Sequence, residues 1–314
     1  MKRFTFEERH LGTPIVLQLV VEGEAYEDAQ AAQHMAGLCF EECARIEAAY
    51  SRFLDDNELA RLNAGLEKWV SVDEEFFRLL EFGERLRERT QGAFDLSVKG
   101  ILEGWGYDKD YSFLESSVGE VGLMELRSST EKAGGSFEVR LSVPVELGGL
   151  GKGYAIDRMV NLLIGECGEL RNLKGFCVNA GGDLFVQGGD ENGEPWRIVF
   201  EHPTNVTMAI GEVKVYGPLA LAASSPSRRS WKNGEKTRHH LVDPRSGEPA
   251  EKMLSVYTQA SAALLADAYS TALFVLGSEE ALALVPELPV EAMLIGPKGQ
   301  IWKSEGFKGE LYLS

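Results

Sequence analysis

The segment Ser261 to Leu276 constrains the fold more than any other stretch, because it is apolar almost all round. A helix without a polar face has to be enclosed by other parts of the protein. Gly277 follows and is a common C-terminal stop, so the sequence predicts a buried helix that ends there. With 314 residues, the chain is long enough to bury a substantial core around such a helix.

Helices and strands are mixed along the remainder of the chain. Apolar residues three and four apart predict a helix over 27–53, and a capping box that begins at Ser71 predicts the start of another. A third helix is expected from Gly153 to a stop at Gly168. Strands are expected over 175–179, 196–200, 208–216, 292–295 and 300–303, with loops and short strands over 107–145. Because strands and helices do not alternate strictly, the pattern favours an α+β architecture.

Charge and cysteine content narrow the classes of function. Lysine and arginine number 32 against 49 aspartates and glutamates, and the net charge of −17 argues against a nucleic-acid or anionic-membrane partner. No stretch approaches the ~20 apolar residues of a transmembrane segment, and no apolar run follows Lys2 and Arg3 as in an export signal. We therefore expect a cytoplasmic protein, although an exported form trimmed of its leader has the same pattern. Cys39 and Cys43, four apart on the first helix, are expected to be core residues.

The densest glycine cluster, ELGGLGKGYAID, runs from Glu146 to Asp157. Glycines allow backbone amides to approach a ligand, and the helix expected to follow suits a phosphate at its N-terminus. The cluster is not a Walker A loop, since Gly153 follows Lys152 where Ser or Thr is required. A ligand-binding turn and a plain strand-to-helix turn are equal alternatives on this pattern alone.

Two further polar clusters stand out. The turn from Asn179 to Asp183, NAGGD, is either the edge of a site or a plain turn. The segment HHLVDPRSG over 239–247 places histidines beside an Asp–Pro turn, where one can serve as a base, or it is a polar loop. Adjacent side chains in an extended segment point to opposite faces, so if His240 faces a site, His239 does not.

The predicted buried helix contains an aspartate and a threonine that need an explanation. Asp267 and Thr271 are four residues apart and therefore share a face of the helix. A carboxylate in apolar surroundings requires a partner, and a carboxylate with a hydroxyl suits Mg²⁺. The alternative is an aspartate that caps a neighbouring element and a threonine that bonds its own helix backbone.

Taken together and in this order, these segments resemble the ApbE-type FAD:protein FMN transferases over nearly the whole chain. The blocks that carry the resemblance are LGT at 11–13, YSRF at 50–53, ELARLN at 58–63, TQGAFD at 90–95, GKGYAID at 151–157, AGGD at 180–183, HLVDPRSG at 240–247 and ADAYST at 266–271. No single block is decisive, whereas the ordered set is highly specific. The resemblance implies an ApbE-like flavin transferase fold of mixed helices and sheets, in which residues 1–314 form a single domain or its two lobes.

The resemblance also implies the chemistry. It predicts an enzyme that uses Mg²⁺ to transfer FMN from its substrate FAD to a Thr or Ser hydroxyl of an acceptor flavoprotein, with release of AMP. The alternatives are an FAD pyrophosphatase that forms FMN and AMP, and a flavin-binding protein without turnover. The presence of Asp267, Thr271 and His240 argues against the last alternative.

Roles for single residues follow from the same resemblance. It implies that Asp267, Thr271 and the backbone carbonyl of Gly149 hold the metal. It makes His240 the base for the acceptor hydroxyl, with Asp243 in the same motif. The residues that it places around FAD are Asn63, Asp95, Gly148, Gly151, Lys152, Gly153, Asp157, Gly181, Gly182, Asp183 and Ser224.

Three positions depart from the family pattern. Asn57 stands where relatives carry Ser, Ser225 where they usually have Gly, and Ser97 where Thr is usual. Pro226 follows Ser225 and is expected to stiffen that loop. These departures bear on acceptor preference and loop geometry more than on FAD binding.

Overall fold

The computed structural model describes residues 1–23, 26–129, 135–165, 172–233 and 236–312. The chain divides into two compact units, each assembled from separate stretches of sequence. The first unit comprises residues 1–47, 150–227 and 253–314, and the second unit comprises residues 48–149 and 228–252. Each unit therefore brings together segments that are far apart in the sequence.

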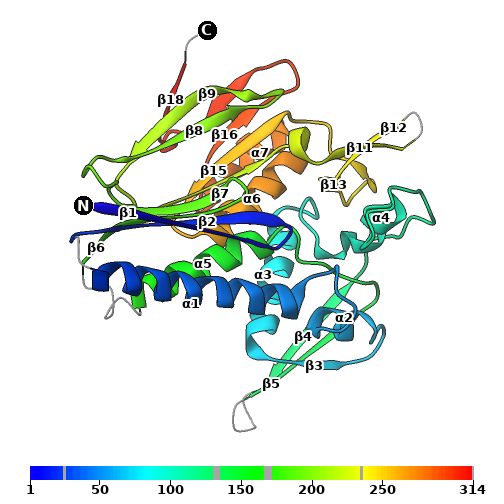
Figure 1. Ribbon diagram of the computed structural model, residues 1–314. Coiled ribbons are helices and arrows are strands. Elements are labelled where there is room, and N and C mark those ends of the chain that lie inside the picture. Colours follow the sequence, from blue (N-terminus) through cyan, green and yellow to red (C-terminus); the bar gives the residue numbers. More distant parts are fainter. Residues whose placement is uncertain (24–25, 130–134, 166–171, 234–235, 313–314) are drawn as a thin grey trace. The chain divides into compact units, whose positions relative to one another are not determined.

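An antiparallel sheet of eight strands forms the centre of the first unit (Figure 1). In spatial order its strands are β1 (Lys2–His10), β2 (Thr13–Val21), β6 (Leu173–Ala180), β7 (Asp183–Gly188), β10 (Leu219–Ser224), β15 (Ser255–Ala260), β16 (Glu291–Ile295) and β17 (Ile301–Lys303). Every neighbouring pair is antiparallel. The alternation of side chains along β2 places Ile15, Leu17 and Leu19 on one face, where all three are fully buried.

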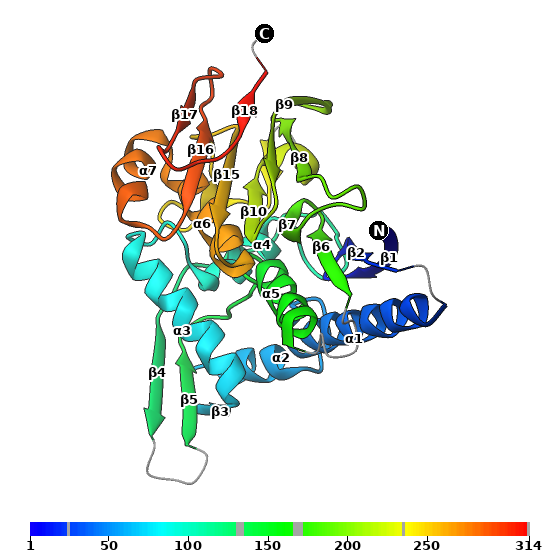
Figure 2. The same ribbon diagram turned by 90° about the vertical axis from the view of Figure 1, so that its left-hand side faces the viewer.

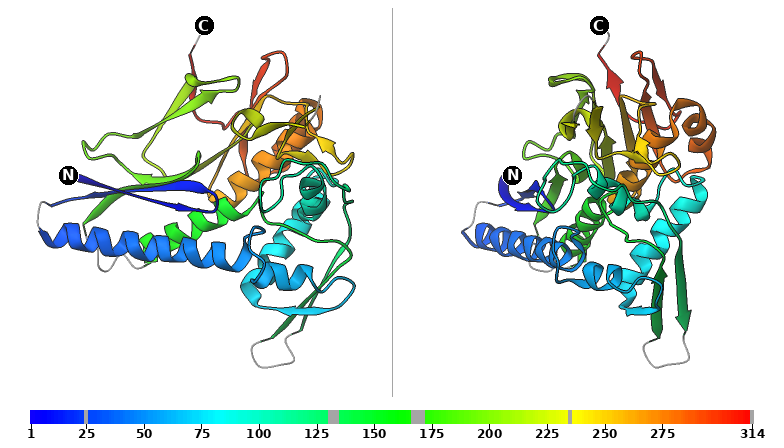
Figure 3. Two further views of the ribbon diagram at one scale, coloured as in Figure 1. Left: turned by 45° about the vertical axis from the view of Figure 1, so that its right-hand side comes forward. Right: turned by 90° about the vertical axis from the view of Figure 1, so that its right-hand side faces the viewer.

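Helices cover one face of this sheet, and a smaller sheet covers the other (Figure 3). The helices of the first face are α1 (Tyr26–Tyr50), α5 (Gly151–Gly165) and α6 (Ala263–Leu276), and α6 is followed by α7 (Ser278–Leu284) and the 3-10 turn η3 (Val285–Glu287). The smaller sheet has the order β18 (Glu310–Leu311), β9 (Asn205–Val215) and β8 (Trp196–His202). Its Trp196, Phe200 and Val213 belong to the same buried core as Val186 and Tyr257 of the large sheet.

The second unit combines a long helix with a three-stranded sheet and two short hairpins. Its helices and 3-10 turns are α2 (Glu58–Asn63), α3 (Glu74–Arg89), η1 (Leu96–Val98) and α4 (Lys99–Gly104). The sheet has the order β3 (Val70–Val72), β5 (Ser136–Leu141) and β4 (Met124–Ser129). The hairpins pair β11 (Ser230–Asn233) with β12 (Lys236–His239), and β13 (Val242–Asp243) with β14 (Glu248–Pro249); the 3-10 turn η2 (Pro226–Arg228) precedes β11. Figure 2 shows α3 beside β4 and β5, where the rings of Phe77 and Phe137 lie 5.1 Å apart.

The predicted α+β architecture is confirmed, and most predicted elements are present. The helix predicted from its apolar face over 27–53 is α1, although it ends at Tyr50, and Cys39 and Cys43 lie in its buried face. The predicted buried helix is α6, and the strands predicted over 292–295 and 300–303 are β16 and β17, which pair as an antiparallel hairpin. The stop expected at Gly168 lies outside the described residues. Among the described helices, none combines the length and the apolar character that a membrane crossing requires.

The predicted capping box at Ser71 is wrong. Ser71 lies in β3, and α3 begins at Glu74 with Asp73 as its N-cap residue. The Asp73 carboxylate accepts a hydrogen bond of 2.7 Å from the backbone N–H of Phe76. Serine and aspartate can both supply this acceptor, so the sequence contains two candidate N-cap residues. Because Ser71 belongs to β3, Asp73 caps the helix.

Candidate functional site

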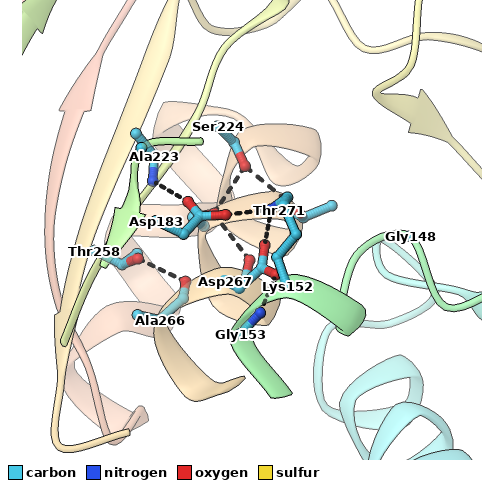
Figure 4. A network of polar contacts seen from close by, with 12 residues as sticks. Gly148, Lys152, Gly153, Asp183, Ala223, Ser224, Thr258, Ala266, Asp267 and Thr271 are labelled. Atoms are coloured by element: carbon cyan, nitrogen blue, oxygen red, sulfur yellow. Dashed lines mark hydrogen bonds and ion pairs between the residues drawn. The ribbon is translucent and has the colours of Figure 1, made fainter. Parts of the chain in front are cut away.

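Three charged side chains meet in the first unit, each from a different element (Figure 4). Lys152 belongs to the first turn of α5, Asp183 begins β7, and Asp267 lies in α6. The Nζ of Lys152 lies 3.2 Å from Oδ1 of Asp267 and also forms an ion pair with Oδ2 of Asp183. The other oxygen of Asp183 accepts a hydrogen bond of 3.2 Å from the backbone N–H of Ala223 at the end of β10. The Lys152 ammonium group therefore joins α5 to β7 and α6, and the Asp183 carboxylate adds β10 to the site.

The charges of this cluster do not cancel. Two buried carboxylates face one ammonium group, which leaves one negative charge without a compensating cation among these three residues. Burial raises the pKa of Asp267 to about 6. Lys152 offsets only part of this rise, and the negative charge of Asp183 adds to it. Burial also opposes the charge on Lys152, but the two carboxylates raise the pKa of Lys152 above its ordinary value. The cluster is therefore electrostatically suited to receive a further cation.

The second oxygen of Asp267 ties α6 to the start of α5. It accepts a hydrogen bond of 2.9 Å from the backbone N–H of Gly153. The first N–H groups of a helix have no partner within the helix, so a carboxylate is a natural acceptor for them. A Cβ atom on Gly153 would lie 2.5 Å from the carbonyl oxygen of Ala263, so only glycine allows the two helices to approach this closely.

A row of hydroxyl groups extends the polar cluster along α6. The hydroxyl oxygen of Ser224, at the end of β10, lies 2.8 Å from that of Ser270 and 3.3 Å from that of Thr271. Thr258 of β15 donates a hydrogen bond of 2.7 Å to the backbone carbonyl of Ala266 and so anchors the helix to the sheet. Neither Ser270 nor Thr258 was predicted from the sequence. Ser270 carried a signal, since it is a further polar residue in an apolar helix, whereas Thr258 carried none.

Asp157 contacts the backbone at the start of α6. Its two carboxylate oxygens accept hydrogen bonds of 2.7 and 2.9 Å from the backbone N–H groups of Ala263 and Leu264. The N-cap residue of α6, Ala262, has no side chain that could do this. Asp157 therefore caps a helix that is distant in sequence, and its expected place in the FAD site stays a prediction.

The predicted glycine turn between β6 and β7 has the backbone that its sequence suggests. Gly181 and Gly182 have φ angles of 67° and 112°, in the region that favours glycine. The N–H of Gly182 donates a hydrogen bond of 2.9 Å to the side chain of Asn179. This tight turn places Asp183 at the start of β7, within reach of Lys152.

Three other predicted residues of the FAD site lie in the second unit and form hydrogen bonds with other residues of that unit. Asn63 forms two hydrogen bonds with Val145, accepting from its N–H at 2.8 Å and donating to its carbonyl at 2.9 Å. Asp95 caps η1 through the N–H and hydroxyl of Ser97, at 2.8 and 2.6 Å, and burial raises its pKa. The N–H of Gly148 donates to the carboxylate of Glu146, as described below. Their contacts with FAD stay predictions.

The two adjacent histidines of the second unit have different surroundings. His239, the last residue of β12, is buried, and its Nδ1 accepts the N–H of Leu241 at 3.3 Å. Burial lowers the pKa of His239 to about 4. His240 is half-buried, and its Nδ1 lies 3.4 Å from the backbone carbonyl of Arg229. The solvent-accessible histidine of the pair is therefore the one proposed as a base.

Asp243 is engaged by its own turn. Both of its carboxylate oxygens pair with the guanidinium group of Arg245 at 3.0 Å, and it also accepts the backbone N–H of Arg245. This arrangement closes the turn between β13 and β14. The catalytic role expected for Asp243 together with His240 stays a prediction.

The structure thus groups Lys152, Gly153, Asp183, Ser224, Asp267 and Thr271, with Gly151 at the start of the same helix, in the first unit. Asp157, Gly181 and Gly182 also belong to the first unit, whereas the other predicted site residues belong to the second unit: Asn63, Asp95, Gly148, Gly149, His240 and Asp243. Over the described ranges, no cluster of three or more His, Cys, Asp or Glu side chains has the arrangement of a metal site.

One departure from the family pattern has a simple local explanation. Asn57 is the N-cap residue of α2, and its side-chain oxygen accepts the N–H of Ala60 at 2.8 Å. Asparagine and serine are both good N-cap residues, so the exchange keeps the helix start. Ser225 donates a hydrogen bond of 3.0 Å to the hydroxyl of Ser227 beside Pro226, within the loop that was expected to be stiff.

Comparison with known proteins places the chain in a family. Residues 11–294 match the ApbE family, so the chain belongs to that family. The FAD:protein FMN transferase of Klebsiella pneumoniae is 30% identical over 82% of this chain and 74% of that protein. The protein of the same name from Salmonella typhimurium is 28% identical over 82% of this chain and 76% of that protein.

Solved structures show the same fold. The ApbE protein of Thermotoga maritima superposes with a TM-score of 0.79 at 25% identity, over 97% of both chains. The flavinyl transferase ApbE of Pseudomonas stutzeri superposes with a TM-score of 0.79 at 22% identity, over 97% of this chain and 95% of that one. The predicted ApbE-like fold is therefore confirmed.

Proposed function

We propose that this protein is an FAD:protein FMN transferase that uses Mg²⁺ to transfer FMN from FAD to a Thr or Ser hydroxyl of an acceptor protein. The observation that carries the proposal is the cluster of Lys152, Asp183, Asp267 and Thr271 at the N-terminus of α5. A helix N-terminus favours phosphate oxygens, and a metal ion held by the carboxylates beside it would favour them further. The names of the curated relatives support the same activity.

The donor set of the cluster suits magnesium. Asp267 supplies a carboxylate and Thr271, one helical turn later, supplies a hydroxyl on the same face. Mg²⁺ is usually held by one or two carboxylates together with water and substrate phosphates, so two protein side chains suffice. The uncompensated negative charge of the cluster favours a cation at this place. The Gly149 carbonyl, implied by the family resemblance, stays a prediction.

The proposed reaction is a substitution at the FMN phosphorus. The acceptor hydroxyl oxygen forms a new bond to that phosphorus, and the bond between the phosphorus and the bridging oxygen of the pyrophosphate breaks, so that AMP leaves. Bound Mg²⁺ would neutralise charge on the phosphates. His240 would accept the proton of the attacking hydroxyl, since it is half-buried and histidine is the side chain most often used as a general base. Lys152 would stay with its carboxylates and orient Asp267.

A direct assay tests this proposal. Purified protein is incubated with FAD and MgCl₂, with and without a candidate acceptor, and AMP is measured by chromatography. We expect AMP together with an acceptor whose mass has increased by one FMN less one water. AMP and free FMN without a modified acceptor would instead identify an FAD pyrophosphatase. Tight FAD binding without any AMP would contradict both reactions.

A further inference from the structure

A buried ion pair in the second unit is not explained by the proposed chemistry. The Nε of Arg52 lies 3.6 Å from Oε2 of Glu146, and both side chains are at least nine-tenths buried. The same carboxylate oxygen accepts the backbone N–H of Gly148 at 2.9 Å. One carboxylate therefore connects a buried cation with the glycine turn that precedes α5.

The guanidinium group of Arg52 is held by aromatic rings. Its central carbon lies 4.5 Å from the ring centre of Phe53 and 4.6 Å from that of Tyr107. Its Nη1 and Nη2 atoms are buried and have no hydrogen-bond partner among the described residues. A buried guanidinium group that forgoes these hydrogen bonds contributes through its charge and stacking. The charge that it faces is Glu146.

The chain before the turn is fixed residue by residue. Both backbone groups of Val145 are bonded to Asn63, and the N–H of Glu146 donates to the carbonyl of Leu96 at 2.8 Å. The next fixed group is the N–H of Gly148, held by the Glu146 side chain. A Cβ atom on Gly148 would lie 2.5 Å from this carboxylate, so the contact requires glycine. The Glu146 carboxylate thus extends these attachments into the turn itself, at the backbone of Gly148.

We propose that Arg52 is a positioning residue for the glycine turn 147–149, acting through Glu146 on the backbone of Gly148. The inference rests on the proposed function, in which the phosphates of FAD lie at the N-terminus of α5, directly after this turn. The positive charge of Arg52 favours the charged form of Glu146, and a charged acceptor holds a backbone N–H more firmly than a neutral one. Burial raises the pKa of Glu146 above its ordinary value, and Arg52 is the main group that opposes this rise. Lys99 and Glu103 of α4 also act on Glu146, with opposite effects, and they pair with one another.

The test compares Arg52→Met, Glu146→Gln and the double variant. Methionine keeps the apolar stem between the two rings, whereas the charge is lost. We expect Arg52→Met to raise KM for FAD about tenfold, the effect of one weakened charged hydrogen bond, with a smaller change in kcat. Adding Glu146→Gln should restore most of this loss, because an amide oxygen accepts the Gly148 N–H without needing a cation. Hydrogen exchange of the 146–151 amides, without FAD, should speed up in Arg52→Met and recover in the double variant.

Arg238→Met is the matched control. Arg238 is also buried in the second unit, lies 4.5 Å from the ring of Trp105 and pairs with Glu115 and Glu248, without contact to the turn. The Arg238→Met variant should have a lower melting temperature and an unchanged KM for FAD. The positioning role would be overturned if Arg52→Met lowers the melting temperature but changes neither KM for FAD nor the hydrogen exchange of the 146–151 amides. Wild-type protein that forms no AMP from FAD would instead overturn the proposed function. The exchange data would still show whether Arg52 and Glu146 hold the backbone of the glycine turn.

Discussion

The Nζ of Lys152 lies 3.2 Å from Oδ1 of Asp267, so the carboxylate proposed to hold magnesium already has a cation beside it. The same Nζ is paired with Asp183, and the three side chains come from different elements. Lys152 therefore makes it possible to bury two carboxylates next to each other. Because it compensates only one of the two negative charges, the cluster can be stable without metal and still attract one.

Removing this lysine should destabilise the protein strongly. Lys152→Met leaves Asp183 and Asp267 buried without their cation, and breaking a buried ion pair in this way costs ~3–5 kcal/mol. Urea unfolding at pH 8 measures the loss. Lys174→Met, which removes an exposed partner of Glu22, is the control and should leave stability essentially unchanged. Equal stabilities of the two variants would mean that Lys152 does not compensate the buried carboxylates.

The part of this site that follows from helical spacing was predictable from the sequence. Asp267 and Thr271 were expected on one face of a buried helix because their four-residue spacing fixes this locally, and α6 has that form. The pairing of Lys152 with Asp183 was not predictable, since they are 31 residues apart and meet only through the packing of α5 on the sheet. Asp157 reaches the amide of Ala263 across 106 residues, which no local pattern reveals.

Contacts between residues distant in sequence also hold the glycine turn of the second unit, and for this reason they were not predicted. The glycine turn was recognised from its composition, but the residues that hold it are distant in sequence. Asn63 contacts Val145 across 82 residues, and Arg52, which lies just after the end of α1, pairs with Glu146. Sequence spacing therefore located the turn, whereas only tertiary packing shows what fixes its backbone.

A second prediction concerns Asp157. Because its carboxylate caps α6, Asp157→Ala should cost ~1–2 kcal/mol of stability, the usual cost of a lost N-cap. Asp157→Asn keeps one acceptor oxygen and should cost less. Urea unfolding and FAD titration are measured on both variants. A role confined to capping predicts lower stability with unchanged FAD affinity, whereas a loss of affinity at full stability would place Asp157 in the FAD site instead.

The buried histidine should make stability depend on pH. Burial lowers the pKa of His239 from 6.5 to about 4, so between these values the unfolded chain binds a proton that the native protein does not. Stability should therefore fall as the pH drops from 6.5 to 4, by up to about 3 kcal/mol from this residue. His239→Asn keeps an acceptor for the Leu241 N–H and cannot titrate. Its unfolding free energy should show a shallower pH dependence in this window, and an unchanged slope would argue that His239 is protonated in the native state.

The last prediction concerns the proposed metal ligand. Asp267→Asn should abolish Mg²⁺-dependent turnover without unfolding the protein. The asparagine oxygen can still accept the Gly153 N–H, and Lys152 keeps its pair with Asp183. The substitution also removes the uncompensated negative charge, so the metal-free variant should be at least as stable as the wild type.

Thermal melts with EDTA or with MgCl₂ and FAD decide the matter for Asp267. The wild type should gain stability from magnesium and FAD together, because a ligand that binds only the native state raises the melting temperature. Asp267→Asn should lose this gain while its melting temperature in EDTA stays at or above that of the wild type. If Asp267 serves only to pair with Lys152 and Gly153, the variant should instead be less stable in EDTA, by ~1–3 kcal/mol, and the wild type should show no gain with magnesium.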